Sequence, residues 1–474
     1  MKRISIVAVA VLAFFLTPGM ALAQNMWGQD QLIGHFDEGL STVGPGFSDF
    51  DCLYGSNTDV FVTFVENSTS STGDKFVVRK SFNNGQTWTY QSSVTGGVNN
   101  LVSPGICTIP GTDMVLASSV TQSPSGTNQI SAYRYRYSDL LSSGYSTADF
   151  SYSGAGNPEY CFLLSNDVAG DIWLFAVDDN NWLFLTRTTD GLNWTTSVPV
   201  AVDVTKPSAV TSSDGHVAVS WIQESTGTVY CSTADADGTF QPAVEVTQNA
   251  SSEANPIASW EHIGDQSIGI LWHSDSGYSW LNISSDLGLT WSADQEIGQG
   301  MYPYMNRFPG TRRMGVCYTT SEGHVMVANS ATLAAVPASE FTRRNNNDAY
   351  TSGPAKTAFG QSSSQLALFY SSQTQEDLWF NSSVFNGISE ENEGNQILSV
   401  AAGPNPAGET FSVQAAGFTG SVTFSVFSLD GRIQFKESSE SGEIIFDSGS
   451  LPTGTYSVIA ENQGSMASCM VVRF

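Results

Sequence analysis

Short apolar stretches that alternate with polar residues recur along this chain, and turn residues such as Gly, Asp, Asn and Ser bound each of them. An alternation with a period of two indicates a strand with one buried face, and frequent turns keep such strands short. We find no stretch with a helical period. The pattern predicts an all-β chain whose clearest strands cover residues 59–65, 114–117, 172–175, 217–221, 268–272, 314–318 and 366–370.

A proline precedes each of these strands, and successive prolines lie about 50 residues apart, a spacing typical of one four-stranded blade of a β-propeller. Proline has no N–H to donate, so we expect it to mark the entry to the innermost strand of each blade. The repeat predicts a seven-bladed β-propeller; a six-bladed ring is the alternative, because the second unit has the least regular outer strand. The prolines are Pro45, Pro104, Pro158, Pro207, Pro256, Pro303 and Pro354.

The last unit supplies three strands and then enters the polar stretch 389–394. Its missing fourth strand has a candidate at the other end of the chain, because residues 27–34 resemble residues 291–298, the outer strand of the fifth unit. We infer that the N-terminal strand completes the last blade. Closure of this kind removes exposed sheet edges.

The first 23 residues have the form of a secretory signal peptide. Lys2 and Arg3 are basic, residues 4–16 carry no charge, and Ala21-Leu22-Ala23 supplies the small residues of a cleavage site, so the mature chain is expected to begin at Gln24. No later stretch approaches the ~20 apolar residues of a transmembrane helix. We therefore expect a secreted or extracellular protein without a transmembrane segment.

Charge and cysteine usage exclude several kinds of partner. The formal net charge is −27, which disfavours nucleic acid and anionic membrane surfaces. The six cysteines form no CxxC pair, and no His stands at a metal-ligand spacing, so we expect neither a metal nor another cofactor. Cys52, Cys107 and Cys161 stand at equivalent places in three units, where either a disulfide or small buried thiols is conceivable.

Three predicted hairpins between third and fourth strands share a motif. Its Asp or Asn side chain accepts bonds from nearby N–H groups, its Gly adopts a positive φ, and its Trp is expected to lie between blades. Ser284, Asp286, Gly288 and Trp291 give the full pattern SxDxGxxW, Ser81, Asn83, Gly85 and Trp88 give it with Asn for Asp, and Asp190, Gly191 and Trp194 form a shortened version.

These hairpins and their 50-residue register resemble the Asp-boxes of the sialidase-like (BNR-repeat) β-propellers over roughly residues 24–390. The resemblance implies that the boxes are structural and lie away from the active centre. A sialidase needs three arginines that clamp a carboxylate, a Tyr–Glu nucleophile pair and an Asp acid. The Arg-Ile-Pro motif of that family is absent, and Arg307 alone among the propeller's arginines lies on a predicted inner strand, which makes an intact clamp doubtful.

The predicted inner strands still carry polar and aromatic residues that suit glycoside chemistry, in which one acid protonates the leaving oxygen while a second group attacks or activates water. Polar residues are also what a wet propeller channel requires in any case. The catalytic candidates are Asp49, Asp51, Glu159, Tyr160, Tyr304 and Arg307, and the binding candidates are Trp260, Tyr302 and Lys356.

A small β-domain follows the acidic linker 389–396. Alternating strands, an Asp430-Gly431 turn and a Pro/Gly loop predict an immunoglobulin-like β-sandwich over residues 397–474. The motif order closely resembles the C-terminal sorting domain of type IX secretion cargo. That resemblance implies recognition by the type IX export machinery and possible attachment of the passenger, residues 24–388, to the cell surface; an ordinary accessory domain is the alternative.

The sequence thus predicts a secreted or surface-displayed propeller that binds extracellular glycans or proteins without catalysis. The alternative is a secreted glycoside hydrolase, a sialidase-like exo-glycosidase. The missing arginine set favours binding, although the fold itself does not fix the function.

Overall fold

The structure is a computed structural model. It describes residues 26–27, 30–35, 50–55, 59–66, 74–83, 85, 87–88, 90–97, 99–148, 156–252, 254–261, 267–307, 313–345, 348–349, 355–359, 365–371, 377–384, 391–392, 396–397, 399–403, 410–416, 421–428, 433–447, 449, 451–462 and 465–473. The chain divides into two compact units, one of which is Trp27–Val384, while the other includes Phe385–Phe474. The predicted signal peptide and the candidate Asp49 lie outside the described residues.

The unit Trp27–Val384 contains seven antiparallel sheets, counted over its described residues. We number them in chain order as sheets 1 to 7. Sheet 1 holds β3 (Phe50–Tyr54), β4 (Val60–Glu66), β5 (Lys75–Ser81) and β6 (Tyr90–Thr95); sheet 2 holds β7 (Asn100–Thr108), β8 (Met114–Gln122), β9 (Gln129–Arg136) and β10 (Ser142–Ala148); sheet 3 holds β11 (Pro158–Asn166), β12 (Asp171–Asp178), β13 (Leu183–Thr188) and β14 (Val198–Ala201). Sheet 4 holds β15 (Val204–Thr211), β16 (Val217–Gln223), β17 (Val229–Ala234) and β18 (Val244–Thr247); sheet 5 holds β19 (Ile257–Trp260), β20 (Ile268–His273), β21 (Tyr278–Ser284) and β22 (Gln295–Gln299); sheet 6 holds β23 (Met301–Arg307), β24 (Met314–Thr319), β25 (Val325–Ser330) and β26 (Thr342–Arg343).

Sheet 7 joins the two ends of this unit. It contains β27 (Lys356–Phe359), β28 (Gln365–Ser371) and β29 (Asp377–Val384), and β29 also pairs with β2 (Gln31–His35) and neighbours β1 (Met26–Trp27). The prediction that an N-terminal strand supplies the missing outer strand of the last unit is confirmed.

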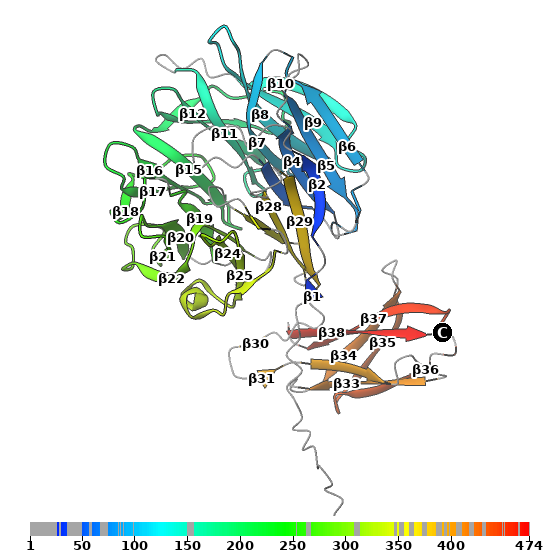
Figure 1. Ribbon diagram of the computed structural model, residues 1–474. Coiled ribbons are helices and arrows are strands. Elements are labelled where there is room, and N and C mark those ends of the chain that lie inside the picture. The colour runs from blue at the N-terminus through cyan, green and yellow to red at the C-terminus, as the bar shows by residue number, and fades with distance from the viewer. Residues whose placement is uncertain are drawn as a thin grey trace, which may run out of the picture. The chain divides into compact units, whose positions relative to one another are not determined.

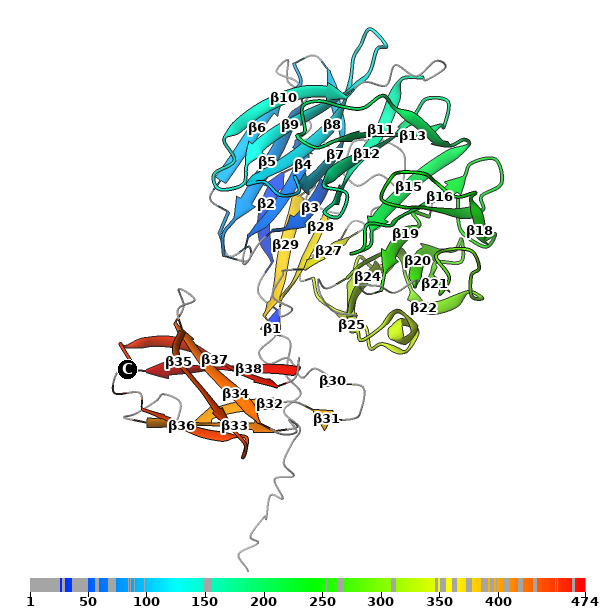
Figure 2. The ribbon, with the colours of Figure 1, turned by 180° about the vertical axis from the view of Figure 1, so that it is seen from behind.

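The first strands of the sheets form a closed ring. Each of β3, β7, β11, β15, β19 and β23 contacts the first strand of the next sheet, and β27 contacts β3 again. Figures 1 and 2 show the sheets of this unit fanned around a common centre. Sheets arranged radially with their first strands innermost make a β-propeller.

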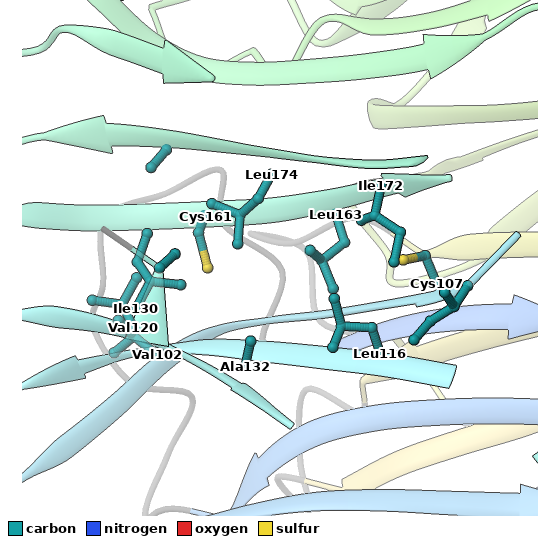
Figure 3. Close-up of a cluster of buried hydrophobic side chains, with 13 residues drawn as sticks. Val102, Cys107, Leu116, Val120, Ile130, Ala132, Cys161, Leu163, Ile172 and Leu174 are labelled. Atoms are coloured by element: carbon teal, nitrogen blue, oxygen red, sulfur yellow. The ribbon is translucent and has the colours of Figure 1, made fainter. Parts of the chain in front are cut away.

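The hydrophobic cores lie between neighbouring sheets. One cluster joins sheets 2 and 3 through Val102, Leu116 and Ile130 on one side and Leu163 and Leu174 on the other (Figure 3). Equivalent clusters join sheets 7 and 1, 1 and 2, 3 and 4, 4 and 5, and 5 and 6. Both faces of sheets 1 to 5 are therefore covered, which explains why second strands such as β12 are buried along their whole length.

Four of the seven repeating prolines lie at the start of a first strand or inside one. Pro158 begins β11, as expected for a strand entry. Pro104, Pro207 and Pro303 instead lie inside β7, β15 and β23, where the pairing with the next strand shifts register. A bulge leaves one residue out of the ladder, so a residue without an N–H is tolerated there.

The second unit contains its own small core. β32 (Ser399–Gly403), β33 (Thr410–Ala416) and β36 (Glu443–Asp447) form one sheet, while β34 (Val422–Ser428), β35 (Ile433–Ser439), β37 (Gly454–Asn462) and β38 (Ser465–Arg473) form another. Phe411, Val413 and Phe446 of the first sheet share a buried cluster with residues of the second, including Phe424 and Val458. β30 (Glu391–Asn392) and β31 (Gln396–Ile397), within the predicted linker, pair with each other.

Within the described residues, no helix has the length and apolar composition that a membrane span requires.

Candidate functional site

Side chains bridge every pair of neighbouring sheets close to the ring of first strands. Adjacent first strands form no common ladder in this fold, so their outward N–H and C=O groups need other partners. From the sheet 1–2 junction to the sheet 7–1 junction, the bridges are Asp51 with Ile106 N, Ser103 with Cys161 O, Thr211 with Ser165 O, Ser208 with Pro256 O, His273 with Tyr302 N, Asn306 with Thr357 O, and Lys356 with Asp51.

Asp51 and Lys356 are the charged pair in this ring. Lys356 Nζ lies 2.9 Å from Asp51 Oδ1, and the other carboxylate oxygen accepts a 3.0 Å bond from Ile106 N. The ammonium also lies 5.7 Å from the centroid of the Phe50 ring and 6.0 Å from that of Tyr304. Both oxygens of the carboxylate are thus engaged within the protein.

Tyr160 and Tyr304 approach the same pair from sheets 3 and 6. Burial is the main cause that raises the pKa of each phenol above its usual range, and the charge of Asp51 contributes to both shifts. Phenols with raised pKa values are neutral at physiological pH. Asp51, Lys356 and Tyr304 thus lie together, and the charge of Asp51 also acts on the pKa of Tyr160. We call these four sequence-predicted candidates the middle layer of the channel.

Glu159 interacts with other charged groups than the middle layer does. Its side chain is exposed, and its pKa is raised by partial burial and then by the charges of Asp179 and Asp178. Both aspartates are held by backbone donors, with Gly156 N on Asp178 and Asn157 N on Asp179. Glu159 and Tyr160 are neighbours in sequence, yet they face different charged groups.

Tyr302 lies at the beginning of β23 and is buried with His273. Its N–H donates to His273 Nδ1 over 3.3 Å, and the two rings meet edge to face with centroids 4.7 Å apart. Burial lowers the pKa of His273 to about 4, and the charge of Lys206 contributes to that shift. The imidazole is therefore neutral at physiological pH. Tyr302, a binding candidate from the sequence, is 4% exposed.

Trp260 and Arg307 line a cavity of about 510 Å³ where the first strands end. Trp260 is the last residue of β19, and Arg307 is the last of β23. Tyr54 and Thr211, at the ends of β3 and β15, line the same cavity. Arg307 lies three residues beyond Tyr304, which is ~10 Å along a strand. We call this opening of the channel the strand-end mouth.

Trp260 forms a wall of that cavity. Its side chain is 1% exposed, its indole N–H donates to Val210 O over 3.2 Å, and its ring packs in the core between sheets 4 and 5. Arg307 is half-buried, and burial lowers its pKa although the charge of Asp214 opposes the shift. Its Nη1 atom is buried and has no hydrogen-bond partner among the described residues.

The remaining described arginines of this unit lie off the first strands. Arg79, Arg134, Arg136 and Arg187 belong to third strands, Arg343 belongs to the outer strand β26, and Arg313 and Arg344 lie outside the strands. No triad of arginines converges on the channel within the described residues.

The three motif-bearing hairpins share one hydrogen-bond pattern. Ser284 Oγ donates to Asp286 Oδ1 and accepts from Gly288 N, both at 2.8 Å, while Thr290 N donates to Asp286 Oδ1 over 2.9 Å. Ser81 with Asn83 and Gly85 repeats the pattern, as does Thr188 with Asp190 and Gly191. The motif glycines have positive φ angles: +79° for Gly85, +72° for Gly191 and +83° for Gly288.

Each motif packs its tryptophan against the preceding sheet. Trp88 of sheet 1 meets the rings of Phe369 and Phe380 in sheet 7, with centroids 6.1 and 5.4 Å away. Trp194 of sheet 3 donates to Ser146 Oγ of sheet 2, and Trp291 of sheet 5 packs in the cluster shared with sheet 4. The prediction that the motif Trp lies between sheets is confirmed.

Strands alternate in direction within each sheet, so the first and third strands both end at the same end of the unit. The hairpins between third and fourth strands therefore lie at that end. The strand-end mouth and the motif hairpins consequently share one end of the unit.

The described cysteines form no disulfide. Cys52, Cys107, Cys161, Cys231 and Cys317 are free thiols, and Cys107 and Cys161 belong to the core in Figure 3. Burial raises the pKa of each of them, to about 12 for Cys161. Of the two possibilities that the sequence leaves open for Cys52, Cys107 and Cys161, buried thiols are confirmed for Cys107 and Cys161, while Cys52 is a free thiol that is only partly buried. No group of three metal-ligating side chains occurs in the described part of the chain.

Apart from Trp260 and Arg307, the residues that line the cavity at the strand-end mouth have no recognisable signal in the sequence. Asp113 and Asp167 lie among turn residues before the predicted strands 114–117 and 172–175, and Asn306 precedes Arg307 without a known motif. Their common position, at or just after the end of a first strand, becomes meaningful once the ring is closed.

Comparisons with known proteins identify the fold. No protein-family model matches the chain, and no curated protein does. The BP39L lectin from Burkholderia pseudomallei has a TM-score of 0.55 at 13% identity, covering 72% of this chain and 97% of the lectin. NanB sialidase from Streptococcus pneumoniae has a TM-score of 0.43 at 11% identity, covering 75% of this chain and 70% of the sialidase. PorZ, a surface component of the type-IX secretion system of Porphyromonas gingivalis, has a TM-score of 0.40 at 10% identity, covering 92% of this chain and 61% of PorZ. At these identities the likeness to the lectin shows the propeller fold alone.

Proposed function

We propose that this protein is a seven-bladed β-propeller that binds extracellular glycans or proteins without catalysis. The observation that carries this proposal is the state of Asp51. It is the carboxylate among the described first-strand residues that shares a layer with Tyr160 and Tyr304, and both of its oxygens are taken by Lys356 Nζ and Ile106 N. A glycosidase needs one acid to protonate the leaving group and a second group to attack or activate water.

The arginines support the same interpretation. Arg307 lies at the strand-end mouth, whereas the other described arginines of the unit lie off the first strands. We infer that the three hairpin motifs are structural Asp-boxes of a sialidase-like scaffold, since their polar atoms are consumed by their own turns.

The same proposal includes an export route. The N-terminal residues 1–23 have the form of a signal peptide, and residues 397–474 resemble a type IX sorting domain, which we propose to be an immunoglobulin-like sandwich that the export machinery recognises. Expression in a host with a type IX system tests the route. Deletion of residues 397–474 should leave the passenger inside the cell envelope, and unchanged release would contradict it.

Assays of purified protein separate binding from catalysis. The full-length protein is incubated with fluorogenic glycosides, including sialosides, and is applied in parallel to immobilised glycans and to extracellular protein extracts. We expect retention on a glycan or protein surface and no turnover. Turnover that disappears in Glu159→Gln would overturn the proposal.

One observation favours the glycoside hydrolase as the second candidate. The pKa of Glu159 is raised by partial burial and by Asp179 and Asp178, which is the direction that suits a general acid. Under this alternative Glu159 protonates the leaving oxygen, and the fluorogenic assay with Glu159→Gln decides between the two functions.

A further inference from the structure

The cavity at the strand-end mouth has the size and lining of a small-molecule site. Its volume of about 510 Å³ lies within the roughly 300–1,000 Å³ that such sites occupy. Its lining comes from at least five sheets, with Tyr54, Asp113, Asp167, Trp260 and Arg307 as representatives. Residues from so many sheets meet here because the ring of first strands is closed.

The lining offers both donors and acceptors. Arg307 presents a buried Nη1 without a partner among the described residues, so the site holds a donor that lacks an acceptor. Asp113 and Asp167 supply exposed carboxylates, and Thr108 and Thr211 supply hydroxyls. A ligand with several hydroxyl groups satisfies donors and acceptors together, because each hydroxyl both donates and accepts.

The charges argue against an ionic ligand. The two carboxylates and one guanidinium among the lining residues sum to −1, and the chain as a whole carries −27. An anion would face the repulsion of both carboxylates and of the whole protein. A cation would be repelled by the guanidinium of Arg307. A neutral polyol avoids both penalties.

We propose that the strand-end mouth binds the end of an uncharged oligosaccharide. In this site Arg307 donates to sugar oxygens, Asp113 and Asp167 accept from sugar hydroxyls, and Trp260 forms an apolar wall. The inference rests on the proposed binding function and deepens it by naming the site and the ligand class. The site lies at the same end as the motif hairpins, which the family resemblance places away from the active centre.

Glycan binding by matched variants tests the site. Full-length protein, Arg307→Gln and Asp167→Asn are compared on a panel of uncharged and acidic glycans, and Kd values for the best glycan are measured by calorimetry. Glu296→Gln is the control, because it removes an exposed carboxylate from the outer strand β22. We expect Kd to rise about tenfold or more in both mouth variants, the effect of about 1.4 kcal/mol, and to stay unchanged in the control.

The outcomes separate this inference from the function on which it rests. Uncharged-glycan binding that survives in both mouth variants overturns the site but leaves a glycan-binding propeller. If the protein binds only acidic glycans, or binds no glycan, the proposed ligand class is wrong. Turnover of glycosides overturns the proposed function itself. Because Arg307 is half-buried, thermal unfolding confirms that its variant is folded, and the exposed Asp167 supplies an independent variant.

Discussion

Asp51 and Lys356 stand 305 residues apart in the chain, yet Asp51 Oδ1 and Lys356 Nζ lie 2.9 Å from each other. The pair joins the first strand of sheet 1 to the first strand of sheet 7, so it closes the ring from the inside, while β2 closes it from the outside by pairing with β29. The side chains of Lys356 and Asp51 are only 13% and 21% exposed. Charges this well shielded from water depend on each other.

Replacing one partner should therefore destabilise the protein. Asp51→Asn leaves the ammonium of Lys356 without its counter-charge, and we expect a loss of about 2–4 kcal/mol in the free energy of unfolding, somewhat below the range for fully buried pairs. Asp139→Asn is the control, since the Arg136–Asp139 pair is exposed and should contribute only about 0.5 kcal/mol. Urea unfolding measures both. Equal losses in the two variants would contradict a structural role for the inner pair.

Gly191 combines a positive φ with a close approach to the preceding sheet. A Cβ at this position would lie 2.7 Å from Leu116 Cδ1. Gly227 has nearly the same φ, +71° against +72°, but a Cβ added there would have no neighbouring atom within 4 Å. The two glycines therefore separate backbone strain from packing between sheets.

We expect Gly227→Ala to cost about 1–2 kcal/mol from backbone strain alone. Gly191→Ala should cost about 1–3 kcal/mol more, because Leu116 must move within the core between sheets 2 and 3. Thermal or urea unfolding of the two variants measures the difference. Equal destabilisation would show that the hairpin does not pack as tightly as described.

The thiols should be unreactive in the folded protein. The thiolate is the reactive form, and burial raises the pKa of all five described cysteines. In a Cys469→Ser background, we expect a thiol reagent to label none of these five rapidly under native conditions and all five after unfolding. Fewer than five labelled after unfolding would reveal a disulfide.

The sequence predicted the repeat, the second strands and the N-terminal strand that completes the last sheet, because each of these signals is local or periodic. Alternation in residues 268–272 identifies a strand whatever surrounds it, and the likeness of residues 27–34 to 291–298 identifies an outer strand. The motif Trp could be placed between sheets for the same reason.

The grouping of site residues could not be predicted, because it depends on register around the ring. The middle layer comes from four sheets: Asp51, Tyr160, Tyr304 and Lys356. That these residues meet could be predicted only if the level of each strand in the channel were known. Trp260 and Arg307 lie at the end of their strands and so belong to another level. Glu159 and Tyr160 face different groups, and Glu159 lies outside the ladder at a register shift between Pro158 and Tyr160.

His273 should make stability depend on pH in a defined window. The imidazole is 1% exposed and has a pKa of about 4 when folded, against about 6.5 when unfolded. Burial and the charge of Lys206 both lower this pKa, and together they outweigh the opposite effect of Asp275. The unfolded chain therefore binds more protons between these two values, so stability is present above pH 6.5 and is lost as the pH falls toward 4.

We expect this group to remove about 2–3 kcal/mol of stability across the window. His273→Gln keeps an acceptor for Tyr302 N but cannot titrate, so the difference in unfolding free energy between pH 7 and about pH 4.5 should shrink by that amount relative to the native protein. His324→Gln, on a partly exposed histidine in the hairpin before β25, is the matched control for the change of histidine to glutamine. The comparison uses the change in unfolding free energy between the two pH values, so any cost of the substitution itself cancels. If this change is the same in His273→Gln as in the native protein, His273 takes up its proton without unfolding the sheet 5–6 junction.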